Sequence, residues 1–200
     1  MNPINIETSE LVIEDITGRD FDSLKKIYND KSIVRYLGKQ EFSDDEISYR
    51  LKEIEHYRSL NLQIACKISL KNTSNFIGYI KVDLFTTTEN QENFNNSNSP
   101  VKEIAPGAEY QCAYLLEQYQ GKGYMGKVFD EIENVLVKKG VKYIFGCMHK
   151  ENRNVIKFTK NRDCQILEKE PIDLYPLNIP LIITKLNNDC FFIKNISPIL

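Results

Sequence analysis

The sequence has little net charge, no long apolar run and no recognisable signal-peptide pattern. Each of these features argues against one class of partner or location. A formal net charge of -2 gives no electrostatic reason to expect nucleic acid or an anionic membrane as a partner. No apolar segment approaches the roughly 20 residues that span a bilayer. The start of the chain lacks the basic and apolar regions of a signal peptide. We therefore expect a cytoplasmic protein.

Metal and disulfide chemistry is also poorly supported by the residues present. His56 and His149 are the only histidines, too few for a histidine-rich metal site. The five cysteines are scattered and never spaced as C-x-x-C: Cys66, Cys112, Cys147, Cys164 and Cys190. This pattern predicts buried thiols in a reducing compartment, with neither a disulfide nor a metal site.

The length and composition of the chain are those of one ordinary globular domain. The chain has 200 residues, of which 42% are hydrophobic and 27% charged. We predict a single domain over residues 1–200, with a C-terminal tail at 187–200. Residues 86–108 are polar, rich in threonine and asparagine and without periodicity, which predicts a long mobile loop. This loop is either a lid over a site or a tolerated surface insertion.

Hydrophobic periodicity predicts strands and helices in the order β-α-α-ββ-loop-β-α-β-α-β-β. The expected strands are Ser9–Ile16, Gln63–Leu70, Phe76–Phe85, Glu109–Leu116, Val141–Met148, Cys164–Leu167 and Leu181–Leu186, with Cys190–Ile193 as an edge strand. The expected helices are Asp20–Tyr28, Ile33–Leu37, a helix capped by Ser43–Glu46 that ends near Ser59, Tyr124–Lys139 and Asn152–Asn161. Gly78 within a strand indicates a bulge or the close approach of another backbone. Only one β-α-β unit is clear, so the sheet is predicted to be mixed.

Gln118–Lys127, a glycine-punctuated loop between a strand and a helix, is the stretch that carries chemistry. Free backbone N–H groups and a helix dipole make such a junction an anion site. Gly121–Gly126 reads G-x-G-x-x-G, but the chain of parallel β-α units that a dinucleotide fold requires is missing. Gly121–Lys127 also reads as a P-loop, but Val128 stands where a magnesium-binding serine or threonine is needed.

A third template, Q/R-x-x-G-x-G, fits Gln118–Gly123 (QYQGKG) and extends beyond the loop. Tyr119–Met125 (YQGKGYM) is similar to Y-W-G-K-G-Y-A, Thr8–Ile13 (TSELVI) to T-x-R-L-x-L, and Phe76–Ile80 (FIGYI) to a second hairpin strand. Asn152–Phe158 (NRNVIKF) lies where N-x-x-S-I is expected. In these features the chain resembles the GNAT superfamily of acetyl-CoA-dependent N-acyltransferases, and within it the ribosomal-protein N-terminal acetyltransferase (RimJ/RimL-like) branch.

The resemblance implies an α/β (mixed α+β) GNAT fold: a twisted mixed sheet of about seven strands, with helices on both faces and a splayed parallel strand pair. It also implies acetyl-CoA (coenzyme A) as the cofactor, with its pyrophosphate on the glycine loop and no metal. The implied cofactor-binding residues are Tyr114, Leu115, Leu116, Gln118, Tyr119, Gln120, Gly121, Lys122, Gly123, Tyr124, Met125 and Asn152. The alternative interpretation of Lys122 is a solvent-exposed surface lysine, and that of Asn152 is the N-cap of a helix.

The implied reaction is N-acetylation of a primary amine, on a protein N-terminus or a small molecule, by direct attack in a ternary complex. Glu109 is the candidate base and His149 the candidate proton donor, although each also reads as a solvated surface residue. Tyr114 and Tyr119 are further candidate donors. The expected partner is a small-molecule or peptide amine, with neither nucleic acid nor membrane involved, and the chain is expected to be a monomer or homodimer.

The sequence departs from the family pattern at the proton-donor positions. Val155 stands in the serine position of N-x-x-S, Phe158–Lys160 has no tyrosine, and Asp163-Cys164 replaces a terminal Gly-Phe. A non-catalytic GNAT-fold module that binds acetyl-CoA therefore stays open as the alternative.

Overall fold

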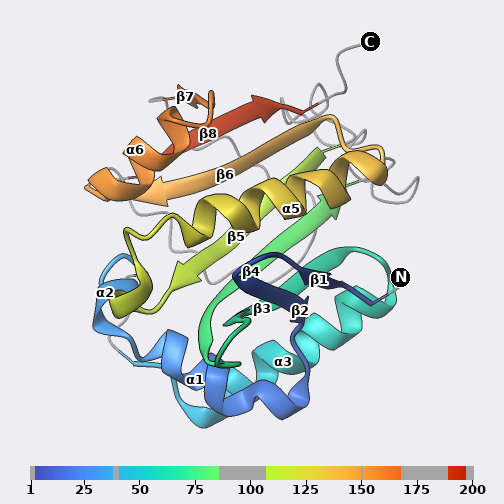
Figure 1. Cartoon of the computed structure of the whole chain (residues 1–200), viewed down its shortest axis with the longest axis vertical. Helices are drawn as coiled ribbons and strands as arrows, with labels where there is room; N and C mark the ends of the chain where they lie inside the picture. Colours follow the sequence, from blue (N-terminus) through green and yellow to red (C-terminus); the bar gives the residue numbers. More distant parts are fainter. Residues whose placement is uncertain (1–2, 38–40, 86–106, 150, 168–188, 197–200) are drawn as a thin grey trace. The chain divides into compact units, whose positions relative to one another are not determined.

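A computed structural model describes residues 3–37, 41–85, 107–149, 151–167 and 189–196 (Figure 1). The chain divides into two compact units, Met1–Asp83 with Gln111–Asn134, and Leu84–Tyr110 with Val135–Leu200. The strand expected at Leu181–Leu186 and nearly all of the loop expected at 86–108 lie outside the described residues.

Antiparallel strands form the sheet of the first unit. They are β1 (Asn5–Glu7), β2 (Leu11–Asp15), β3 (Gln63–Leu70) and β4 (Phe76–Phe85), each hydrogen-bonded to the next. The β3–β4 hairpin has the predicted bounds, and its register shifts between Ile68 and Ser69, opposite Gly78. A Cβ at Gly78 would lie 2.4 Å from the backbone oxygen of Tyr114, so only glycine fits there. Both the irregularity and the close approach expected at Gly78 are confirmed.

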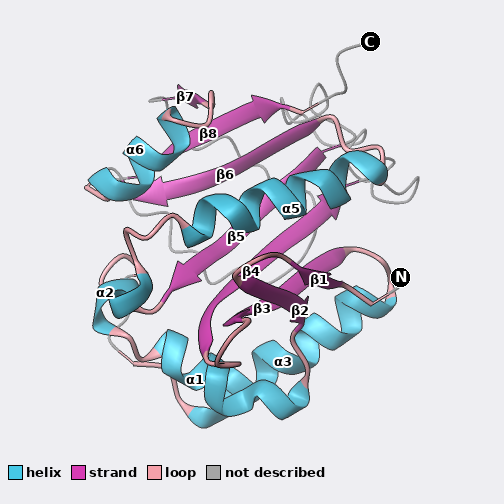
Figure 2. Cartoon of the chain, in the orientation of Figure 1, coloured by secondary structure: helices cyan, strands magenta, loops and turns pink. Residues whose placement is uncertain are grey.

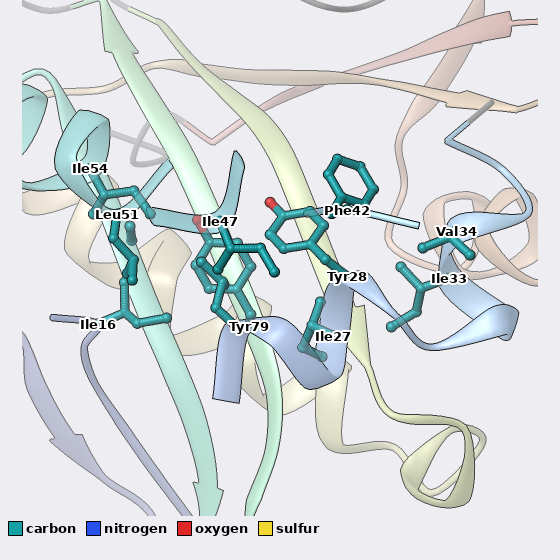
Figure 3. Packing of buried hydrophobic residues seen from close by; sticks show 12 residues of the cluster. Ile16, Ile27, Tyr28, Ile33, Val34, Phe42, Ile47, Leu51, Ile54 and Tyr79 are labelled. Atoms are coloured by element: carbon teal, nitrogen blue, oxygen red, sulfur yellow. The ribbon is translucent and has the colours of Figure 1, made fainter. Parts of the chain in front are cut away.

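Helices cover this sheet from the N-terminal half of the chain. A 3₁₀ turn, Gly18–Asp20, leads into α1 (Phe21–Tyr28), followed by α2 (Lys31–Val34) and α3 (Asp44–Ser59). The predicted capping box starts α3, because Ser43 and Glu46 bond each other's backbone N–H groups. Figure 3 shows the core that forms where α1, α2 and α3 meet the strands. Its buried side chains include Ile27, Ile47, Leu51, Ile54 and Tyr79.

The second unit contains the only parallel strand pair among the described residues. The start of β5 (Gly107–Leu115) pairs with β6 (Tyr143–His149) from Gly107↔Tyr143 to Tyr110↔Gly146. Next to β6 comes β8 (Asp189–Asn195), and β7 (Gln165–Leu167) lies outside it (Figure 2). The prediction of an edge strand at Cys190–Ile193 is therefore wrong. Strand β8 is hydrogen-bonded to a neighbouring strand on each side. An uninterrupted apolar run is better suited to this interior position than to an exposed edge.

Two helices follow strands that carry candidate residues. Helix α5 (Tyr124–Lys138) is followed by Gly140, whose φ of +79° is the left-handed conformation expected of a glycine after a helix. Helix α6 (Arg153–Lys160) begins after Asn152, whose side chain accepts from the Val155 N–H. No helix among the described residues is long and apolar enough to cross a membrane. Within the described residues the mixed sheet has eight strands, where about seven were predicted, and its parallel β5–β6 pair confirms the predicted α/β fold class.

Candidate functional site

The glycine loop of the first unit connects β5 to α5 through an unusual backbone path. A 3₁₀ turn over Glu117–Tyr119 follows the strand, and α5 begins at Tyr124. Between them Gly121 and Gly123 have φ values of +72° and +80°. Glycine adopts these left-handed conformations without the steric penalty of a Cβ atom. A Cβ built on either residue meets nothing within 4 Å, so the space beside the loop is open.

This path leaves a run of backbone donors without acceptors. Among the described residues, nothing accepts from the N–H groups of 121–125. Residues 121–123 are exposed, and the run ends in the first turn of α5, where the helix dipole favours negative charge. Successive N–H groups at a helix N-terminus, with open space beside them, fit a pyrophosphate without a metal ion.

Side chains from the α1–α2 region hold the loop in place. The Gln120 side-chain nitrogen donates to the Leu115 carbonyl at 2.8 Å and to the Ser32 hydroxyl at 3.1 Å. The Glu117 N–H donates to Asp30 at 3.2 Å, and the same carboxylate accepts from the Ser32 N–H at 2.8 Å. Sequence reasoning missed Asp30 and Ser32, because their spacing signals only a helix N-cap. These bonds fix where the strand turns into the loop.

The alternative interpretation of the loop as a P-loop is not supported by the first residues of α5. Lys127, the lysine of that pattern, forms an ion pair with Glu10. Val128, in the position of the magnesium ligand, is fully buried. Lys122, in contrast, is exposed, with its nitrogen 5.6 Å from the centre of the Tyr119 ring. The cation beside the open loop is thus Lys122.

The other cofactor candidates of the first unit lie at the end of β5 and in the loop. Leu115 is buried, Tyr114 and Leu116 are half-buried, and Gln118 is exposed. The Leu116 N–H is used inside the protein, where it donates to the Ile77 carbonyl at 2.9 Å. Any contact of a ligand with this strand end must therefore use other backbone groups.

The remaining candidates, Glu109, His149 and Asn152, belong to the second unit. Glu109 lies in β5 opposite Phe145 and is only 2% exposed, so the solvated reading of this glutamate does not hold. His149 ends β6 half-buried, and its Nδ1 accepts from the Glu151 N–H at 3.2 Å. Asn152 is the N-cap of α6, with its side-chain oxygen 3.3 Å from the Val155 nitrogen. The N-cap reading of Asn152 is therefore confirmed, and it leaves the asparagine NH₂ group for other partners.

The departures from the family pattern have a structural explanation at one position. Asp163, where glycine is usual, has a φ of +58°, so the backbone keeps the glycine-like conformation. Aspartate tolerates this region better than most residues do. In α6 the buried hydroxyl is Thr159, which donates to the Val155 and Ile156 carbonyls at 3.1 and 3.0 Å.

Within the described ranges, no His, Cys, Asp and Glu side chains gather into a set able to hold a metal ion.

Comparison with known proteins agrees with this geometry. A family model described as an acetyltransferase (GNAT) domain matches residues 10–164. A search of curated protein sequences finds no match. Among solved structures, the ribosomal-protein-S5-alanine acetyltransferase from Vibrio fischeri has a TM-score of 0.70 at 15% identity, covering 98% of each chain.

Two other solved structures were determined with coenzyme A. The ribosomal L7/L12 α-N-protein acetyltransferase RimL has a TM-score of 0.69 at 10% identity, covering 96% of this chain and 98% of its own. Spermidine N-acetyltransferase from Vibrio cholerae, which also contains spermine, has a TM-score of 0.63 at 14% identity, covering 94% and 96%. At these identities the likeness shows a shared fold.

The family-model match spans more than half of the chain, and the fold and the open glycine loop agree with it. Acetyl-CoA is the cofactor that this family uses. The chain therefore belongs to the GNAT acetyltransferase family.

Proposed function

We propose that this chain is a cytoplasmic N-acetyltransferase that transfers the acetyl group of acetyl-CoA to a primary amine by direct attack in a ternary complex. The observation that carries the proposal is the run of N–H groups at 121–125 without acceptors among the described residues. The named activities of the structural relatives, on ribosomal proteins and on spermidine, support an amine as the acceptor class.

The chain's own groups suit the polar parts of coenzyme A. The N–H groups of 121–125 bind the pyrophosphate, and the exposed Lys122 adds positive charge beside it. Gln118 and Tyr119 lie in the same loop. Tyr114–Leu116 present backbone groups other than the Leu116 N–H to the pantetheine arm, and the NH₂ group of Asn152 donates to that arm. When bound, acetyl-CoA supplies the thioester whose acetyl group is transferred.

Acetyl transfer also requires a base and a proton donor. The amine nitrogen bonds to the thioester carbonyl carbon, the carbon–sulfur bond breaks, and the departing thiolate takes a proton. We assign removal of the amine proton to Glu109, a carboxyl group shielded from solvent. We assign the donated proton to His149, because an imidazole that accepts at Nδ1 has its proton on Nε2. Tyr114 and Tyr119 are the alternative donors.

Ligand-dependent melting tests the cofactor part of the proposal. A ligand at about 100 times its Kd stabilises the folded chain by about 2.7 kcal/mol, which raises the Tm by roughly 5 to 10 °C for a chain of this size. We expect this shift with acetyl-CoA and none with NADH or Mg·ATP. Stabilisation by either nucleotide, with no effect of acetyl-CoA, would refute the proposal.

The alternative function is a non-catalytic module that binds acetyl-CoA, favoured by Val155 in the serine position of α6. Release of coenzyme A thiol, measured with a panel of amines, separates the two functions. An enzyme releases thiol in the presence of at least one amine, whereas a binding module shows the thermal shift and no amine-dependent release.

A further inference from the structure

A group of polar and aromatic side chains lies in the first unit, and of its members only Tyr114 has been given a role so far. It consists of Arg50 from α3, Tyr28 from α1, Tyr79 from β4, and Cys112 and Tyr114 from β5. We call it the Arg50 cluster. Arg50, Cys112 and Tyr114 are half-buried, whereas Tyr28 and Tyr79 are buried. Tyr28 and Tyr79 thus form the buried part of the cluster, and the other three residues are partly in contact with solvent.

Arg50 brings a positive charge to this cluster. Its guanidinium carbon lies 4.9 Å from the centre of the Tyr28 ring and 5.0 Å from that of Phe42. In the described part of the chain no carboxylate pairs with it, whereas Arg58 on the same helix pairs with Asp15 at 3.6 Å. Ring contacts offset only part of what a half-buried guanidinium loses in hydration. An anion bound beside the guanidinium would complete the site.

Tyr79 contributes a second incomplete group. Its side chain is 0% exposed, and its hydroxyl has no hydrogen-bond partner among the described residues. Buried hydroxyls are nearly always paired, so such a group indicates a ligand or a water molecule. Figure 3 shows the hydroxyl oxygens of Tyr28 and Tyr79 directed to the same side of the core.

The phenols of the cluster are hydrogen-bond donors. Burial raises the pKa of Tyr28, Tyr79 and Tyr114 well above the usual tyrosine value, so all three stay protonated at neutral pH. A guanidinium with neighbouring hydroxyl donors is suited to a carboxylate or a phosphate.

The cluster also adjoins the cofactor loop through two connections. Tyr114, whose ring centre lies 6.5 Å from that of Tyr28, is at the end of the strand that leads into the loop. Asp30, which follows α1 closely after Tyr28, accepts from the Glu117 N–H in the loop. The cluster and the loop therefore lie at the same end of β5.

We propose that the Arg50 cluster binds an anionic group, a carboxylate or a phosphate, carried by the acceptor amine. This inference rests on the proposed acetyltransferase function and narrows its acceptor class. It excludes polyamines as preferred acceptors, because their cationic groups are repelled by Arg50. The competing explanation is that Arg50 and Tyr79 only pack the core.

Matched acceptors test this preference in the full-length chain. Glucosamine 6-phosphate with glucosamine tests the phosphate, and tyrosine with tyrosine amide tests the carboxylate, while spermidine represents polyamines. We expect kcat/KM for at least one anionic acceptor to exceed that for its neutral partner by about 10- to 100-fold, the effect of a charge-assisted hydrogen bond. Equal values within both pairs, or a preference for spermidine, would overturn the proposal.

Variants separate ligand binding from packing. Tyr79→Phe removes only the hydroxyl without a partner, so it should leave the Tm unchanged or raise it, while raising KM for the anionic acceptor about 10-fold. Arg50→Gln should abolish the anionic preference, and Arg50→Lys should restore part of it. Lys52→Gln removes an exposed cation from the same helix and should change nothing. Unchanged KM in Tyr79→Phe and Arg50→Gln would show that these residues only pack.

A second readout keeps this inference distinct from the proposed function. If no amine releases thiol, the transferase proposal fails, and binding of glucosamine 6-phosphate and tyrosine to the coenzyme A complex is then measured by calorimetry. Binding of either one that Arg50→Gln abolishes would still support the anion site. If neither probe binds the coenzyme A complex, the anion site is refuted independently of the transferase proposal.

Discussion

The left-handed glycines of the chain allow backbone strain to be separated from ligand binding. Gly123, in the loop, has a φ of +80°, and Gly140, after α5, has a φ of +79°. A Cβ on either residue meets nothing within 4 Å. The variants Gly123→Ala and Gly140→Ala therefore introduce the same strain without a clash, and only Gly123 lies in the proposed cofactor loop.

The expected magnitudes follow from this geometry. A left-handed alanine costs about 1–2 kcal/mol, and the smaller entropy of the unfolded chain returns about 0.5–1 kcal/mol. Both variants should therefore lose roughly 0.5–1 kcal/mol of unfolding free energy, or about 1–4 °C in Tm. In Gly123→Ala the strained residue turns the neighbouring N–H groups away from the position of the pyrophosphate. Loss of one or two charge-assisted bonds, each about 1.5–3 kcal/mol, should weaken acetyl-CoA binding at least 10-fold.

Calorimetric titration with acetyl-CoA, together with urea unfolding, measures both quantities on the same samples. We expect similar losses of stability in the two variants, with weaker binding only in Gly123→Ala. Wild-type affinity in Gly123→Ala, with the expected loss of stability, would refute the assignment of the loop to the pyrophosphate.

Three further variants test the supports of the first unit. Gly78→Ala should lose about 1–3 kcal/mol in urea unfolding, because its Cβ would lie 2.4 Å from the Tyr114 backbone oxygen; a change under about 0.5 kcal/mol would contradict this packing. Asp30→Ala should weaken acetyl-CoA binding several-fold and lower stability by about 1–2 kcal/mol, because it frees the Glu117 N–H and removes the cap of α2; unchanged affinity would show that the loop holds without it. Burial opposes the charge of Asp20, but hydrogen bonds from Lys67 and Thr17 outweigh burial and lower its pKa. Its contribution to stability is therefore complete above the ordinary aspartate pKa of about 3.9 and is lost as the pH falls through the lowered value; Asp20→Asn should flatten the decline of stability below about pH 5, and an unchanged decline would contradict the shift.

Local signals explain why much of the fold was predictable from the sequence. The start of α3 follows from a capping box whose partners are three residues apart, and the β3–β4 hairpin follows from two apolar runs with a turn between them. The glycine loop was found in the same way, since its glycines and the following helix are contiguous.

Features that depend on distant partners were not predictable. The pairing of β8 on both edges requires β6 and β7, and nothing in an apolar run identifies its neighbours. The bonds from Gln120 to Ser32 and from Glu117 to Asp30 join residues far apart in sequence. Arg50 likewise has nothing in its local sequence that distinguishes it from other helical cations, because its ring contact is with Tyr28 on another helix.

The most direct test of the central claim is an amide NMR titration of the isotope-labelled chain with acetyl-CoA and, separately, with pantetheine, which lacks the pyrophosphate. We predict that acetyl-CoA shifts the backbone amide signals of residues 121–125 strongly and that pantetheine leaves them nearly unchanged, because these N–H groups bond to phosphate oxygens. If acetyl-CoA binds and these signals do not move, the loop is not the pyrophosphate site and the account is wrong.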